Sequence, residues 1–136
     1  MAEADAPLDA ERILRALAEH GVDYVLIGGL AVQTHGHVRT TIDADLIPAP
    51  EPANMERLAE ALCSLDPLVR GKIDVMHEVP GGRPYAELSE RALHVRLGDL
   101  DVPVVDLDDL IQMKLARGRP TDLADVAALT DPAGTE

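Results

Sequence analysis

The sequence predicts a single α+β domain, α/β-like in its first half, with a mixed β-sheet flanked by helices. Strand-like and helical segments alternate through the first half, a strand pair follows, and two helices close the chain. The length of 136 residues fits one domain, and 46% hydrophobic residues suffice for one core. The domain is expected to cover residues 1–136, with flexible ends at about 1–7 and 131–136.

Composition narrows the partners that the protein can have. The core must be aliphatic, because Tyr24 and Tyr85 are the only aromatic residues, and this also argues against stacking of unpaired bases as the main binding mode. The formal net charge is −13, from 12 basic and 25 acidic residues. Such a surface repels nucleic acid overall, since cations that neutralise phosphates provide most of the affinity. DNA is therefore not an expected partner.

The sequence also indicates the cellular compartment in which the protein is expected. Cys63 is the only cysteine, so no disulfide forms within the chain, and we expect a buried thiol on a helix. The opening stretch MAEADAPLDAER is acidic where a signal peptide would be basic. No apolar run approaches the length that spans a membrane. We expect a cytoplasmic protein without a membrane partner.

Helices and strands alternate in the first half. Ile13, Leu14 and Leu17 share one face of a helix that begins after Asp9 and ends before Gly21. The elements expected next are a buried strand over 23–27, a helix over 30–34, a strand over 41–47 and a helix over 51–65.

The second half is expected to add a hairpin and a helix pair. The elements predicted in order are a strand over 72–76, a turn over 80–84, a short helix over 85–91 and strands over 93–97 and 102–105. Asp106 or Asp108 is expected to cap the next helix, which ends near Gly118. Thr121 is expected to cap the last helix.

The sharpest feature is an aspartate pair, Asp43 and Asp45, in the alternating stretch TIDADLI. Both side chains are expected on one strand face, roughly 7 Å apart at a rise of about 3.3 Å per residue, with Ile42, Ala44 and Leu46 facing the core. Two such carboxylates repel each other unless solvent or a cation intervenes. Magnesium typically takes one or two carboxylates plus substrate phosphates. Taken alone, however, this pattern more often means two solvated aspartates on an exposed strand.

A glycine pair precedes the aspartate strand. Gly28 and Gly29 follow a buried strand and precede a helix, where a glycine backbone can approach a phosphate closely. A plain strand-to-helix turn is the other interpretation. Arg39 and Thr40 lie just before the aspartates, and Arg39 is equally well a phosphate contact or a surface arginine.

Two blocks of sequence resemble a known superfamily. The stretch DYVLIGGLAVQTHGHVRTTIDADLI resembles the active-site core of the nucleotidyltransferase superfamily with the polymerase-beta-type fold. The stretch DLDDLIQMKLARGRPTDLADVAAL resembles the C-terminal part of its small bacterial branch, which is similar to the toxins of abortive-infection systems. The resemblance covers roughly residues 23–129. It is specific for the fold, which it implies to be the nucleotidyltransferase fold, and less specific for the substrate.

The resemblance implies roles for individual residues. The residues implied to contact the nucleotide are Gly28, Gly29, Arg39, Thr40 and Arg117. The residues implied to hold the metal are Asp43, Asp45 and Asp74. The residues implied to complete the catalytic set are Lys114 and Asp122, with Arg119 and Asp125 near them. The implied cofactor is magnesium, with manganese as an alternative, and a nucleoside triphosphate is the implied substrate.

Two of these residues have other interpretations. Asp74 shares a strand face with Lys72 and Met76, and it converges with the aspartate pair only if the two strands are neighbours. The connection over 66–71 is shorter than in the bacterial branch, so Asp74 is misassigned, the pocket is unusually open, or activity is lost. Lys114 lies in an apolar helical run and either reaches toward phosphates or Asp122, or extends to solvent along apolar surface.

Three functions follow, in decreasing order of support. The first is magnesium-dependent transfer of a nucleoside monophosphate to an acceptor hydroxyl on a protein, an RNA end or a small molecule. The second is a catalytically inactive nucleotide-binding or partner-binding module, with a cognate protein partner in a toxin–antitoxin pair. The third, a purely structural domain, requires all the motifs to coincide by chance.

Overall fold

Among the residues that the structure describes, the sheet has five strands in the order β3-β2-β1-β5-β4. The computed structural model describes residues 9–37, 43–69 and 71–131, so the expected flexible ends lie outside this part except for Asp131. The strands are β1 (Tyr24–Ile27), β2 (Asp43–Pro48), β3 (Lys72–Val75), β4 (Leu93–Leu97) and β5 (Leu100–Val104). The sheet is mixed, as predicted, and the chain is an α+β domain.

The strand pairing brings three distant segments together. β1 pairs antiparallel with β2 and parallel with β5, and β2 pairs parallel with β3. The register places Ile27 opposite Asp45, and Asp45 opposite Asp74. The C-terminal end of β1 and the N-terminal ends of β2 and β3 therefore meet at one end of the sheet.

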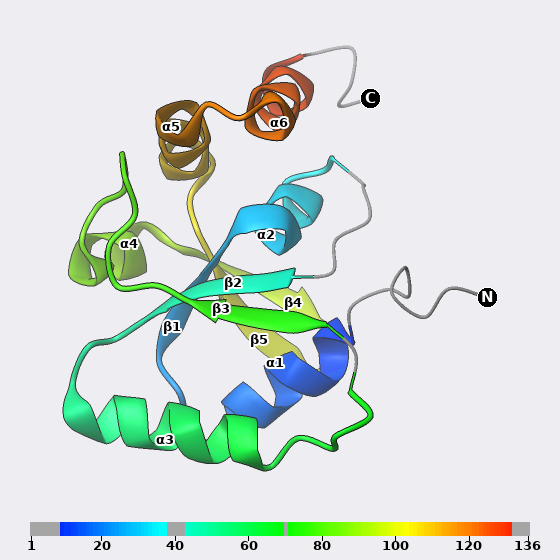
Figure 1. Cartoon of the computed structure of the whole chain (residues 1–136), viewed down its shortest axis with the longest axis vertical. Helices are drawn as coiled ribbons and strands as arrows, with labels where there is room; N and C mark the ends of the chain where they lie inside the picture. Colours follow the sequence, from blue (N-terminus) through cyan, green and yellow to red (C-terminus); the bar gives the residue numbers. More distant parts are fainter. Residues whose placement is uncertain (1–8, 38–42, 70, 132–136) are drawn as a thin grey trace.

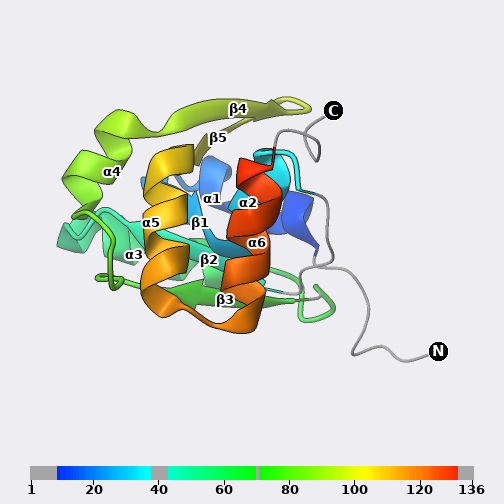
Figure 2. The ribbon, with the colours of Figure 1, turned by 90° about the horizontal axis from the view of Figure 1, so that it is seen from above.

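Helices cover both faces of the sheet. They are α1 (Ala10–Glu19), α2 (Gly28–Thr34), α3 (Pro52–Cys63), α4 (Tyr85–Arg91), α5 (Leu107–Arg117) and α6 (Pro120–Thr130). Figure 1 shows α1 and α3 on one face and α2, α5 and α6 on the other. In Figure 2, α5 and α6 lie side by side above β1, β2 and β3. The C-terminal helices α5 and α6 therefore face strands from earlier in the chain.

The core is aliphatic, as the composition predicts. Val25, Leu26 and Leu46 on the central strands and Leu17 on α1 are almost completely buried. Burial of such side chains stabilises the fold by roughly 1.5–3 kcal/mol each. The central strands that carry the candidate site are therefore among the best-packed parts of the domain.

Several local expectations need correction. Cys63 is exposed, because Leu58 and Ala61 define the inner side of α3 and a residue two positions further along a helix faces away. Thr121 does not cap α6, which begins at Pro120 with Arg119 in the cap position, since proline favours the first helical position. Of the two caps considered for α5, Asp106 is the one, and it accepts a hydrogen bond from the Asp108 amide at 3.1 Å.

Candidate active site

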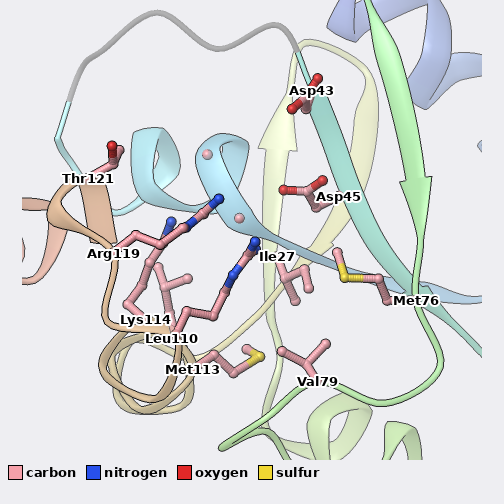
Figure 3. Close-up of a pocket in the computed structure, with 13 residues that line it drawn as sticks. Ile27, Asp43, Asp45, Met76, Val79, Leu110, Met113, Lys114, Arg119 and Thr121 are labelled. Carbon is pink, nitrogen blue, oxygen red and sulfur yellow. The ribbon is translucent and has the colours of Figure 1, made fainter. Parts of the chain in front are cut away.

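Asp43 and Asp45 share one face of β2, as strand alternation predicts. Ala44 and Leu46 point into the core and are completely buried, whereas both aspartates are partly exposed. Figure 3 shows the two carboxylates at one side of a cavity that lies between the sheet and α5. The prediction of Ile42 as a core residue falls outside the described residues.

Gly28 lies directly against Asp45. Its φ of +71° lies in the left-handed region, and α2 begins here rather than at residue 30. A Cβ placed at Gly28 would overlap the Asp45 carboxylate and come within 2.9 Å of the Asp45 Cβ. Any side chain at Gly28 would therefore displace Asp45. The glycine is required here by backbone conformation and by space.

Asp74 lies beside Asp45 on the neighbouring strand. The parallel register sets the two residues opposite each other. The Lys72 ammonium lies 3.5 Å from an Asp74 oxygen, because Lys72 and Asp74 share a strand face. The structure thus brings Asp74 to the aspartate pair, although it is not one of the described residues that line the cavity.

The ionised form of Asp45 is disfavoured in the protein without a bound cation. The pKa of its carboxyl is raised from 3.8 to about 6, first by burial and then by hydrogen bonding with Asp74 and by the charges of Asp74 and Asp43. The positive charge of Arg117 opposes this shift. A bound cation would relieve the repulsion between these carboxylates.

The donor atoms at this end suit a hard divalent cation. Asp43 and Asp45 offer carboxylate oxygens, and magnesium commonly uses one or two such groups together with substrate phosphates. Within residues 9–37, 43–69 and 71–131, no group of three or more His, Cys, Asp or Glu side chains is arranged to hold a metal ion. Asp74 as a third ligand therefore stays a prediction.

The cavity has a volume of about 190 Å³ and two chemically different ends. The polar end is lined by Gly28, Gly29, Asp43, Asp45, Lys114, Arg117, Arg119 and Thr121. The apolar lining residues are Ile27, Met76, Val79, Leu110 and Met113, of which Figure 3 shows Met76, Val79 and Met113 on the side away from Asp43, called here the apolar end. Figure 3 shows the carboxylates facing the side chains of α5 and the α5–α6 connection across the space. Small-molecule pockets usually enclose about 300–1,000 Å³, so a ligand that fills such a pocket would be partly exposed here.

Lys114 is buried on α5 and is bound by two acids of α6. Its ammonium lies 3.0 Å from an Asp125 oxygen and 3.3 Å from an Asp122 oxygen. Its exposed fraction is 7%, so the contact with Asp122 expected from the sequence is present and the alternative of a solvent-directed lysine is wrong. Lys114 nevertheless lines the polar end of the cavity.

Asp122 connects Lys114 to Arg119. The Arg119 guanidinium donates to its carboxylate at 2.8 Å and 3.2 Å, and the Arg119 amide donates at 3.2 Å. These bonds lower the pKa of Asp122 to about 2, against the opposing effect of burial, and Lys114 acts in the same direction. The carboxylate is therefore ionised at neutral pH and fixes both cations.

Arg117 differs from these cations. It ends α5, just before the left-handed turn at Gly118, and lines the polar end of the cavity. It makes no hydrogen bond or ion pair with the part of the chain that the structure describes. Its side chain can thus contact a bound anion without breaking a hydrogen bond or ion pair with the described residues. Arg39 and Thr40, the other expected nucleotide contacts, lie outside the described residues.

Sequence reasoning missed most of the apolar end. Met76 had a signal, because it shares a strand face with Asp74. Met113 lies next to Lys114 in an apolar helical run, where a methionine usually means ordinary core. Val79 lies in a connection without periodicity, so nothing in the sequence indicates that it faces a cavity.

The arrangement is that of a nucleotidyltransferase fold. A solved structure, an antigenic nucleotidyltransferase-like protein from Paracoccidioides brasiliensis, is similar with a TM-score of 0.57 at 15% identity. The similarity covers 91% of this chain and 78% of that chain. No curated protein matches the sequence.

The chain belongs to the family described as "Nucleotidyltransferase of unknown function (DUF6036)", whose model matches residues 8–130. The resemblance found in the sequence is thus confirmed at the level of the superfamily. No helix among the described residues is long and apolar enough to cross a membrane.

Proposed function

We propose that the protein is a magnesium-dependent nucleotidyltransferase that moves a nucleoside monophosphate from a nucleoside triphosphate to an acceptor hydroxyl. The acceptor oxygen attacks the α-phosphorus and loses its proton. The bond from that phosphorus to the β-phosphate oxygen breaks, and pyrophosphate leaves with the electron pair. The acceptor is a protein side chain, an RNA end or a small molecule.

One observation carries this proposal: across a cavity, a carboxylate pair with one member packed on a glycine backbone faces Arg117, which has no ion pair among the described residues. Asp43 and Asp45 supply negative charge on the sheet, and Arg117 supplies positive charge on α5. A triphosphate with its cation complements both, because the cation meets the carboxylates and the phosphate oxygens meet the guanidinium. A solvated strand face requires neither the glycine contact nor the cavity.

The proposed roles follow from position. Asp43 and Asp45 would hold magnesium, or manganese in its place, and Gly28 and Gly29 let a triphosphate approach their backbone. The chemistry that the bound metal supplies is a lower pKa for the acceptor hydroxyl and neutralisation of the departing pyrophosphate. Arg117 would bind phosphate oxygens.

The other residues predicted from the sequence would support this arrangement. Lys114, held by Asp122, would present positive charge at the cavity wall, and Asp74, opposite Asp45 on the neighbouring strand, stays the proposed third metal ligand. Arg39 and Thr40 stay proposed nucleotide contacts.

The test is transfer of label from α-labelled triphosphates in the presence of magnesium. Wild type is expected to produce labelled acceptor and pyrophosphate, and Asp43→Asn and Asp45→Asn to lose both. Asp101→Asn is the matched control, because Asp101 is an exposed aspartate on β5 outside the cavity. Equal labelling by wild type and Asp45→Asn would end the proposal.

A second candidate is a catalytically inactive module that binds nucleotide or a cognate protein partner, in a cytoplasmic toxin–antitoxin pair. It is favoured by the engagement of Lys114 with two acids, which leaves less positive charge for phosphates. Binding of triphosphate without release of pyrophosphate, with any candidate acceptor, would favour this module over the enzyme.

A further inference from the structure

The apolar end of the cavity has no assigned ligand. Figure 3 shows Met76, Val79 and Met113 grouped away from Asp43, with Ile27 between the two ends. Ile27, Leu110 and Met113 are almost completely buried, whereas Met76 and Val79 are partly exposed. The cavity therefore continues from a charged end onto an apolar wall.

This wall is fixed in place by the connection between β3 and α4. A Cβ at Gly81 would come within 2.6 Å of the Ala116 Cβ, and one at Gly82 within 3.2 Å of the Met113 sulfur, so the connection packs closely on α5. Arg83 donates at 2.8 Å to Asp109 of α5, which is buried. Val79 is consequently held against the cavity by contacts on its C-terminal side.

Groups that could form hydrogen bonds to a ligand are scarce at this end. The side chains of Met76, Val79 and Met113 carry no nitrogen or oxygen atom. The Met76 amide already donates to the Leu46 carbonyl at 3.0 Å, and the Val79 carbonyl accepts from the Gly82 amide at 2.8 Å. Methionine sulfurs make favourable contacts with aromatic rings. The surface thus suits a planar, apolar group held by its face.

We propose that the base of the nucleoside triphosphate packs on Met76, Val79 and Met113, and that the site discriminates weakly among the four bases. This rests on the proposed function. A nucleoside triphosphate joins a highly charged end to a planar ring system, which matches the two ends of this cavity. Strong discrimination requires side chains that hydrogen bond to the edge of the base, and an apolar wall separates similar ligands only weakly.

The test compares the affinity of magnesium complexes of ATP, GTP, CTP, UTP and inorganic tripolyphosphate by calorimetry. We expect the four nucleotides to bind within about tenfold of one another, each at least about tenfold more tightly than tripolyphosphate. Met76→Ala should weaken all four nucleotides about tenfold and leave tripolyphosphate unchanged. Met76 is only partly buried, at the edge of the core, so this variant is suited to keep the fold.

Met55→Ala is the control, because Met55 is a partly buried methionine of α3 on the opposite face of the sheet. Met113→Leu, which conserves volume, gives a second variant with the same expected direction. The inference is overturned if nucleotides bind no more tightly than tripolyphosphate, if Met76→Ala weakens both equally, or if one base is preferred more than about 100-fold.

Failure of the proposed function gives a different result. Binding of tripolyphosphate that Asp45→Asn abolishes, with no gain from any base, would overturn only the assignment of the apolar end. Absence of binding by every compound, or equal binding in Asp45→Asn, would overturn both.

Discussion

Gly28 and Asp45 are packed so closely that the Asp45 carboxylate fills the space that a side chain at Gly28 would occupy. This contact joins the end of β1 to β2 at the centre of the sheet. It fixes Asp45 next to a bare backbone rather than in open solvent.

Gly28→Ala should be destabilising for two reasons that a control can separate. The left-handed backbone costs about 1–2 kcal/mol for alanine, and the collision with Asp45 adds about 1–3 kcal/mol. Gly21→Ala is the matched control, because Gly21 has φ +66° and nothing lies within 4 Å of the position that its Cβ would take. Urea unfolding measures both variants, and equal losses would show that the collision does not matter.

Asp45→Asn should stabilise the metal-free protein at neutral pH. Because the pKa of Asp45 is raised to about 6, ionisation disfavours the folded state. The resulting loss in the free energy of unfolding is absent below pH 4, grows between pH 4 and pH 6, and is constant above pH 6. After allowance for solvent screening, we expect a gain of about 1 kcal/mol in the free energy of unfolding at pH 7.5.

The measurement is urea unfolding of wild type and Asp45→Asn with a chelator, at pH 4 and pH 7.5. A difference between the two proteins that fails to grow with pH would contradict the interpretation of Asp45 as a strained carboxylate.

Asp122→Asn should have the opposite effect. Asp122 is completely buried and neutralises Lys114 and Arg119, and removing one partner of a buried ion pair costs about 3 kcal/mol. The pKa of Asp122 is lowered to about 2, so its stabilisation is complete above pH 4 and is lost as the pH falls toward 2. The free energies of unfolding of wild type and Asp122→Asn should therefore converge as the pH falls over this range. A difference that stays constant would refute the assignment.

Arg117→Ala should separate binding from stability. Since Arg117 has no internal ion pair among the described residues, its loss should change the free energy of unfolding by less than about 0.5 kcal/mol. Binding of magnesium tripolyphosphate should weaken about tenfold or more, because a charged hydrogen bond is worth about 1.5–3 kcal/mol. Gln112→Ala, at an exposed position of α5, controls for helix substitution. Unchanged binding would remove Arg117 from the site.

Local patterns predicted much of this structure from the sequence. The alternation around Asp43 and Asp45 gave the correct strand face, and the hairpin and α4 lie close to where periodicity placed them. The pairing of Asp74 with Asp45 depended on strand order, which the sequence offered only as a condition.

The errors have tertiary causes. Asp125 was expected near Lys114 from the resemblance, but the ion pair between them depends on how α6 lies against α5, which no local pattern encodes. Val79 reaches the cavity because glycine and ion-pair contacts fix its connection to α5. Arg119, not Thr121, precedes α6 because proline starts the helix and the Asp122 side chain bonds back to the arginine amide.

The position of α5 and α6 at the C-terminal end of the chain has a consequence for synthesis. A nascent chain that ends after Val104 contains all five strands, the glycine contact and every acid on β2 and β3. Its cationic partners, Lys114, Arg117 and Arg119, have not yet been added. The three cations that line the cavity from α5 and the α5–α6 connection therefore reach these acids only when α5 and α6 leave the ribosome and dock.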